Sequence, residues 1–382
     1  RMERSLQNYR CRELRVLSNR ESISFGDGSL TMYVDDTELN RDSGIFIRSA
    51  EGTLFNMNDC KLFDALPGIR ESQGSPDVFT CQYSGAIWHP ICYEYDPERY
   101  AAISKKKYLA KFEAVARAID ILRPNLYFPS AGPPCFLDPE LAHLNSEPVN
   151  IFPNSDKVLE YLAKRLQKDP VPLFHALPGD KIEIRSGTVT CAEAGARLSE
   201  SDRTQYLTKY ADSIGPIAQD LRQADPDDVF SRLTEEFERK LERFAFASRI
   251  DVPLYVYVNE VPDKVVKIDF PNNRVEQVLE RTDDAYYSLS APAWELARVL
   301  DRKLTWDEFG LTFRVKLRRQ PDVYQPFLYA FLILEIETID LYCRHMLDLE
   351  ANDERIIVKC ADKEYSILRY CPHMGADLSS AY

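Results

Sequence analysis

The sequence predicts an α/β domain, an α+β domain and the beginning of a third, smaller domain. Short strands and amphipathic helices alternate over residues 1–192, which is typical of α/β sheets. Helices and strands come in separate groups over 193–350, as in α+β domains. Two alternating apolar segments around a turn at 361–363 open the last region, 351–382. We therefore expect three domains with these boundaries.

The first domain is expected to start with paired strands and to continue with a long helix. Its expected strands are 23–25, 30–34, 44–48, 53–57, 78–82 and 125–128. Gly-containing turns separate the first two pairs, as in β-hairpins. A helix is predicted over 99–122, because Phe112, Val115 and Ile119 recur at steps of three and four and Pro124 ends the pattern.

Three of these strands end in polar or glycine-rich tips. The tips are Asn58-Asp59, Tyr83-Ser84-Gly85 and Ser130-Ala131-Gly132. In open α/β sheets ligands bind at such strand ends, so neighbouring strands would bring the tips into one cleft. Asp59 could be a metal ligand or could cap the segment that follows it, and its position in the sequence does not decide between these two roles. Ser84 has no adjacent His–Asp pair, so a serine hydrolase is unsupported.

The second domain shows no chemical motif and is expected to serve packing. Its expected helices and helical pieces are 206–221, 229–247, 289–300, 306–309 and 327–346. Its expected strands are 254–258, 265–270 and 311–317.

Composition excludes several classes of function. A net charge of −13 argues against a general binder of nucleic acid or of anionic membranes. No apolar run is long enough for a membrane span, and no signal peptide is visible. The nine cysteines are scattered without a Cys-x-x-Cys pair, which favours reduced thiols in a cytoplasmic protein.

The most informative stretch is Cys371-Pro372-His373, which is followed by Met374-Gly375. A Cys and a His two residues apart in a tight turn can ligate the two irons of a Rieske [2Fe–2S] cluster. The Rieske pattern also has a Cys-x-x-His pair, and no Cys or His follows His373. A free Cys beside a surface His is the weaker alternative. We therefore expect a fragment of a longer protein, inactive alone.

Six blocks, taken together, resemble a known family. They are 55–59, 82–88, 129–136, 139–145, 150–153 and 371–379. They closely resemble the bacterial UDP-N-acetylmuramate hydroxylase family, which joins a metallo-β-lactamase-like domain to a C-terminal Rieske domain. The resemblance implies that the first domain is a partial metallo-β-lactamase-like αββα sandwich and that the last region starts an all-β Rieske domain.

The resemblance also implies an activity. The expected enzyme is a monooxygenase that uses O₂ to hydroxylate the N-acetyl group of a UDP-amino sugar, giving the N-glycolyl form for the cell wall. An unactivated C–H bond needs a metal–oxygen oxidant. The resemblance therefore implies mononuclear iron (or zinc) in the metallo-β-lactamase-like domain, in addition to the [2Fe–2S] cluster. The expected partners are the nucleotide sugar and an electron-donating reductase or ferredoxin, with no nucleic acid.

Site residues follow from the same resemblance. Cys371 and His373 would bind the cluster, and Asp59 matches the metal-site aspartate. His143 would be a metal ligand or substrate contact, although a lone His is more often structural. The residues lining the substrate cleft would be Gln82, Ser84, Ser130 and Gly132.

The chain departs from the family pattern, and two other functions stay open. The family's His-rich loop would lie before residue 1, and His89 stands where a Tyr is expected. Packing is the better interpretation of His89, and His175 is also expected to be structural. The alternatives are a metallo-β-lactamase-type hydrolase with a regulatory Rieske-like domain, and a non-catalytic remnant.

Overall fold

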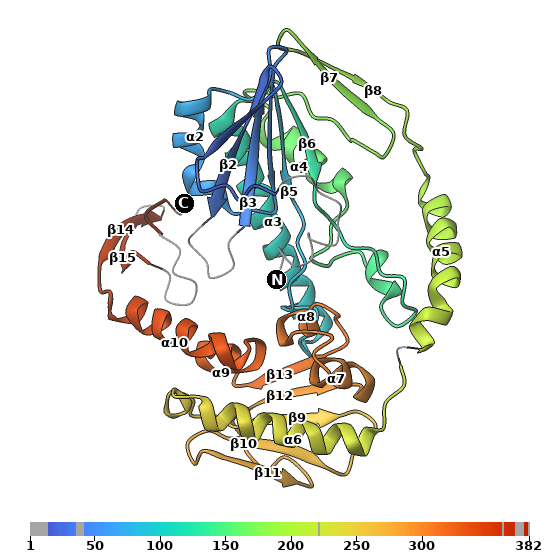
Figure 1. The fold of residues 1–382 in the computed structure, drawn as a ribbon, viewed down its shortest axis with the longest axis vertical. Helices are drawn as coiled ribbons and strands as arrows, with labels where there is room; N and C mark the ends of the chain where they lie inside the picture. Colours follow the sequence, from blue (N-terminus) through green and yellow to red (C-terminus); the bar gives the residue numbers. More distant parts are fainter. Residues whose placement is uncertain (1–13, 36–41, 221, 361–362, 371–377, 381–382) are drawn as a thin grey trace. The chain divides into compact units, whose positions relative to one another are not determined.

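The computed structural model describes residues 14–35, 42–220, 222–360, 363–370 and 378–380. The chain divides into two compact units, each with its own sheet (Figure 1). The first unit comprises 1–83, 111–132 and 155–196, and the second comprises 84–110, 133–154 and 197–382. No helix in the described part is long and apolar enough to cross a bilayer. The division into three domains stays a prediction.

The first unit is built on a six-stranded sheet in sequence order. The strands are β1 (Ser22–Phe25), β2 (Gly28–Asp35), β3 (Asp42–Arg48), β4 (Thr53–Asn58), β5 (Val78–Gln82) and β6 (Leu126–Ser130). Strands β1 to β4 pair antiparallel with their neighbours, and the β1–β2 and β3–β4 hairpins are those that the sequence predicts. Strands β4, β5 and β6 are parallel. Helix α2 (Leu66–Gln73) connects β4 to β5, and helix α3 (Pro97–Leu122) lies between β5 and β6 in the sequence.

An aromatic ladder fixes the register of this sheet. Phe46 lies opposite Phe55, Phe55 opposite Phe79, and Phe79 opposite Tyr127. Each successive pair of ring centroids is 5.7 Å apart, and each side chain is at most 1% exposed. A slip of one residue would turn these rings to the other face, so the ladder stabilises one alignment of the strand ends.

Helix α4 (Ser155–Arg165) and a hairpin of β7 (Lys181–Arg185) and β8 (Thr188–Ala192) complete the first unit. Val158 and Leu162 of α4 are fully buried. Arg165 donates to both carboxylate oxygens of Glu113 on α3, which ties the two helices together.

The second unit contains a five-stranded sheet in the order β11-β10-β9-β12-β13. Its strands are β9 (Leu254–Val258), β10 (Val265–Asp269), β11 (Arg274–Val278), β12 (Tyr286–Ala291) and β13 (Lys316–Gln320). Leu254, Val256 and Leu289 point into a core shared with helix α6 (Pro226–Arg243), which lies along this sheet (Figure 1). Asp225 caps α6 by accepting from the amides of Asp227 and Asp228.

The remaining elements of the second unit are mostly helical. They are α5 (Glu200–Asp220), α7 (Ala293–Leu300), α8 (Trp306–Gly310), α9 (Pro326–Ile333), α10 (Ile336–Ala351), and a hairpin of β14 (Arg355–Cys360) and β15 (Lys363–Leu368). The hairpin is the one that the sequence predicts before Cys371.

Three sequence predictions in this unit are wrong in detail. The helix expected over 289–300 begins at Ala293, because Leu289 pairs with Val256 inside the sheet. The strand expected over 311–317 begins at Lys316. The helix expected over 327–346 is interrupted, because the backbone at Leu334 is extended. A buried helix that is apolar on all sides has no periodicity to reveal such a break.

Candidate functional site

The three polar tips follow strands that are neighbours in the sheet. Because β4, β5 and β6 are parallel, their carboxyl ends lie at the same edge. Asn58 is paired with Cys81, and Gln82 with Ser130, so the ends are also level with one another. These strands are therefore neighbours, which is the condition under which the sequence predicts one cleft for the tips.

Asp59 follows a sharp change of direction at the end of β4. The register shifts between Asn56 and Asn58, and Asn58 takes the left-handed conformation with φ of 53°. The Asn58 amide donates to the Asn56 side chain at 2.9 Å, which holds this turn. Asp59 itself is exposed. It does not cap the next helical turn, whose N-cap is Lys61 without a side-chain hydrogen bond, and its role as a metal ligand stays a prediction.

Gln82 and Ser130 offer polar atoms at the same edge. The Oε1 of Gln82 accepts from Lys111 Nζ at 2.6 Å, which brings a positive charge from α3 to the end of β5. The Ser130 hydroxyl is buried and has no hydrogen-bond partner in the described part of the chain. A buried hydroxyl without a partner is costly, so a ligand that bonds to it would recover that energy.

Gly132 helps to hold two of the tips together. Its carbonyl accepts from the Tyr83 hydroxyl at 3.2 Å, which links the segment after β6 to the segment after β5. Ala131, between Ser130 and Gly132, has a φ of 51°, so the chain turns sharply here as it does after β4.

Ser84 and His143 belong to the second unit. Ser84 is 2% exposed, and its hydroxyl donates to the Ile151 carbonyl at 3.4 Å, a long contact inside a protein core. His143 is exposed in a short 3₁₀ turn, with Nδ1 3.1 Å from the Glu140 carbonyl. Their predicted roles in substrate or metal binding stay predictions.

The described residues alone do not fit the expected mononuclear metal. No group of three His, Cys, Asp or Glu side chains among them is arranged to hold a metal ion. Cys371 and His373 lie outside the described residues.

Two other histidines have structural surroundings, as the sequence predicts. His89 Nε2 lies 2.9 Å from the Tyr95 hydroxyl. Burial, together with the positive charges of Lys107 and Arg319, lowers the pKa of His89 to about 4, so it is neutral at pH 7. His175 contacts Ser155 Oγ at 2.8 Å and Asp156 at 3.0 Å.

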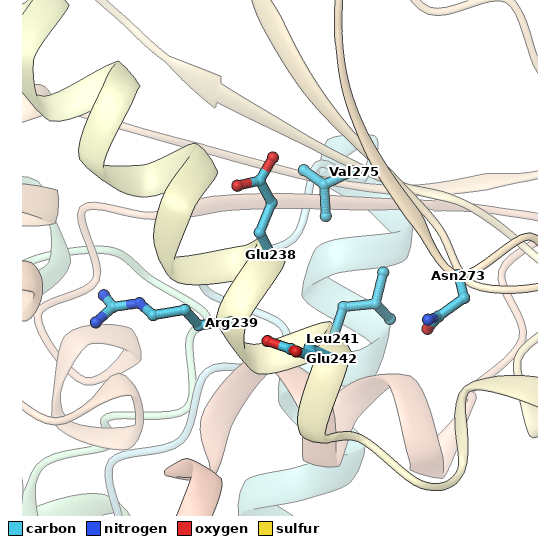
Figure 2. A pocket seen from close by; sticks show the side chains of 6 residues that line it. All are labelled: Glu238, Arg239, Leu241, Glu242, Asn273 and Val275. Atoms are coloured by element: carbon cyan, nitrogen blue, oxygen red, sulfur yellow. The ribbon is translucent and has the colours of Figure 1, made fainter.

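Sequence reasoning missed two hollows among the described residues of the second unit. One, of about 400 Å³, is formed by one stretch of α6 and by residues at and after the β10–β11 turn (Figure 2). It is lined by Glu238, Arg239, Leu241, Glu242, Asn273 and Val275. Arg239, its one positive charge, forms a salt bridge with Glu236 at 2.6 Å. This hollow therefore offers no unneutralised cation.

The other hollow, also of about 400 Å³, lies over β9, β12 and β13. It is lined by Glu94, Tyr257, Val258, Asn259, Pro262, Arg281, Tyr286, Ser288, Ser290, Lys316 and Arg318. The alternation of Tyr286, Ser288 and Ser290 with less polar residues is the available signal, but the helix predicted over 289–300 covers only Ser290 of these three.

The sequence is similar to proteins named as Rieske 2Fe-2S iron–sulfur proteins. No family model matches the chain. It is 28% identical over 355 residues to a provisionally named Rieske 2Fe-2S iron–sulfur protein of Mycobacterium tuberculosis, and to one of Mycolicibacterium smegmatis. Each alignment covers 88% of this chain and 66% of the relative, so the chain spans just under two thirds of the length of these relatives.

Among solved structures, the chain is similar to CmlA, a diiron β-hydroxylase from Streptomyces venezuelae. That match has a TM-score of 0.25 and 12% identity, and it covers 41% of this chain and 32% of CmlA. A mutant of the same β-hydroxylase gives a TM-score of 0.26 and 14% identity, over 42% of this chain and 31% of that one.

Proposed function

We propose that this chain is the larger part of a Rieske-linked monooxygenase. The observation that carries the proposal is similarity to Rieske 2Fe-2S proteins over 88% of the chain. The Cys371-Pro372-His373 segment supports it, because a Cys and a His at this spacing suit one half of a Rieske site. Such a cluster supplies electrons one at a time when bound, and a reductase or ferredoxin would reduce it.

The proposed substrate is a UDP-amino sugar, hydroxylated on its N-acetyl group. The ends of β4, β5 and β6 carry amide, hydroxyl and carbonyl groups that suit a sugar and its acetamido group. Lys111 adds a positive charge beside Gln82, which suits the charged part of a nucleotide sugar. Asp59 is proposed as the carboxylate of the metal site, and a cytoplasmic location belongs to the same proposal.

The first test concerns the cluster. In the full-length protein, Cys371→Ala is expected to abolish both the Rieske electron paramagnetic resonance signal and the oxygenation of UDP-N-acetylmuramate, with an unchanged circular dichroism spectrum. Cys191→Ala is the matched control, because Cys191 is an exposed cysteine on β8. A retained signal or retained turnover in Cys371→Ala would contradict the proposal. Bound zinc without iron, together with hydrolysis, would favour the hydrolase alternative.

The second test concerns the strand ends. Ser130→Ala removes a buried hydroxyl at the end of β6 that has no partner in the described chain, so the fold loses no hydrogen bond. We expect kcat/KM to fall by about tenfold or more through loss of one substrate hydrogen bond. The cluster signal and the melting temperature should not change. Thr188→Ala, at an exposed position on β8, is the control, and equal activity of the two variants would exclude Ser130 from the site.

A further inference from the structure

One face of the five-stranded sheet in the second unit combines a tyrosine and valine cluster with polar side chains of β12 and β13. Leu254, Val256 and Leu289 point to the core that contains α6. Because successive residues of a strand point to opposite faces, Tyr257 and Ser288 lie on the other face. That face carries the hollow over β9, β12 and β13.

Strand register arranges the polar side chains of this face in rows. Tyr257 lies opposite Ser290, and Ser290 lies opposite Lys316. Two residues along, Ser288 lies opposite Arg318. Residues two apart on a strand are roughly 7 Å apart, so the long side chains of Lys316 and Arg318 can reach one ligand together.

Within the described part of the chain, two cations of the hollow lack the salt-bridge partners that other cations on the same face have. Lys267 is paired with Asp283 at 2.8 Å, and Arg274 is paired with Glu276. Lys316 and Arg318, by contrast, form no salt bridge to any described residue. Both are exposed.

A third cation completes a locally positive hollow. The Arg281 guanidinium lies 3.8 Å from the centroid of the Tyr286 ring, which places its charge over the same face. Glu94 is the one acidic residue among the lining side chains. Three cations and one carboxylate thus line a hollow on a chain whose net charge is −13. This local excess of positive charge favours an anionic ligand.

We propose that this hollow binds a small ligand that carries a phosphate group. Arginine and lysine bind phosphate oxygens by charge-assisted hydrogen bonds, and serine hydroxyls such as those of Ser288 and Ser290 add neutral donors. A volume of about 400 Å³ is that of a small-molecule site. Tyr257, which is partly exposed, provides aromatic surface for the rest of the ligand. The proposal goes beyond the oxygenase function, because it requires neither a cluster nor a metal.

Isothermal titration calorimetry of the 382-residue chain with inorganic pyrophosphate and with UDP tests this proposal. The decisive variant is the double substitution Lys316→Gln and Arg318→Gln, which changes exposed residues only. The matched control is Arg274→Gln, an exposed cation of the same face that has a salt-bridge partner. We expect the double variant to weaken binding by about tenfold or more and the control to leave it unchanged. Binding should also weaken as salt is raised.

Each outcome of the titration has a defined meaning. Tighter binding of UDP than of pyrophosphate would assign part of the site to the nucleoside, and equal binding would assign it to phosphate alone. No binding of either probe, or equal binding by the double variant and the wild type, would overturn the proposal. Binding of poly-glutamate in place of both probes would also overturn it, in favour of an acidic protein partner. None of these results depends on oxygenase activity.

Discussion

Lys240 is a lysine in the core of the second unit. Its side chain is 1% exposed, and its Nζ lies 5.2 Å from the ring centroids of both Trp306 and Phe331. Its Nζ donates a hydrogen bond to the Leu332 carbonyl at 3.4 Å, near the C-terminal end of α9. Burial lowers the pKa of Lys240 to about 7, against the opposing effect of the carboxylates of Glu335 and Glu236 and with a small contribution from Arg302.

This lysine makes stability depend on pH. Between pH 7 and pH 10.5 the unfolded chain keeps the Lys240 proton and the folded chain releases it. The contribution of Lys240 to the free energy of unfolding therefore increases with pH across that window, by about 1.4 kcal/mol for each pH unit. The same contribution is lost when the pH is lowered toward 7. We expect Lys240→Met to abolish this rise, measured by urea unfolding at several pH values.

The control for that experiment is Lys303→Met, because the Lys303 side chain is 67% exposed and pairs with Asp301. It should keep the pH dependence of the wild type, since other titrating groups are unchanged. Identical pH profiles for Lys240→Met and the wild type would show that Lys240 holds its proton in the folded state.

At the scale of elements, the end of α8 packs directly against an aromatic ring. A Cβ atom placed on Gly310 would lie 1.4 Å from Cε2 of Trp88. Trp88 is 3% exposed and belongs to the core of the second unit. Only a glycine lets the indole approach the helix end this closely.

Gly310→Ala is therefore expected to destabilise the protein by about 1–3 kcal/mol, because the buried indole must move. Gly68→Ala in α2 is the control, since Gly68 is exposed and its Cβ would meet nothing within 4 Å. That change should raise stability by roughly 0.5–1 kcal/mol, through helix propensity. Urea unfolding followed by circular dichroism measures both, and an unaltered midpoint for Gly310→Ala would contradict the packing argument.

Local patterns predicted the strands of the first unit well and the second unit less well. Turn glycines and short apolar runs indicated β1 to β5 closely. The parallel order that brings Gln82 level with Ser130 is a long-range property, so the sequence predicts one cleft only if the three strands are neighbours. In the second unit, Ser288 and Arg318 are separated by thirty residues and meet through strand pairing, so no local motif indicates their hollow.

At the scale of the whole molecule, each of the two compact units is built from segments that are not continuous in the sequence. The segments 84–110 and 133–154 precede the change near residue 193, yet both group with the second unit. The buried Trp88 and Cys92 of the first segment contribute to the second unit's core, for example. Apolar patterning shows that a segment is buried but not which core contains it, so sequence alone could not assign these two segments.

The distribution of aromatic residues gives each unit its own optical signal. The three tryptophans of the chain, Trp88, Trp294 and Trp306, all belong to the second unit. The first unit contains no tryptophan, but it holds Phe46, Phe55, Phe79 and Tyr127 in the ladder across β3 to β6. Tryptophan fluorescence therefore reports unfolding of the second unit, whereas the near-ultraviolet circular dichroism of tyrosine includes the first. One unlabelled sample thus reveals whether the two units melt together or in turn.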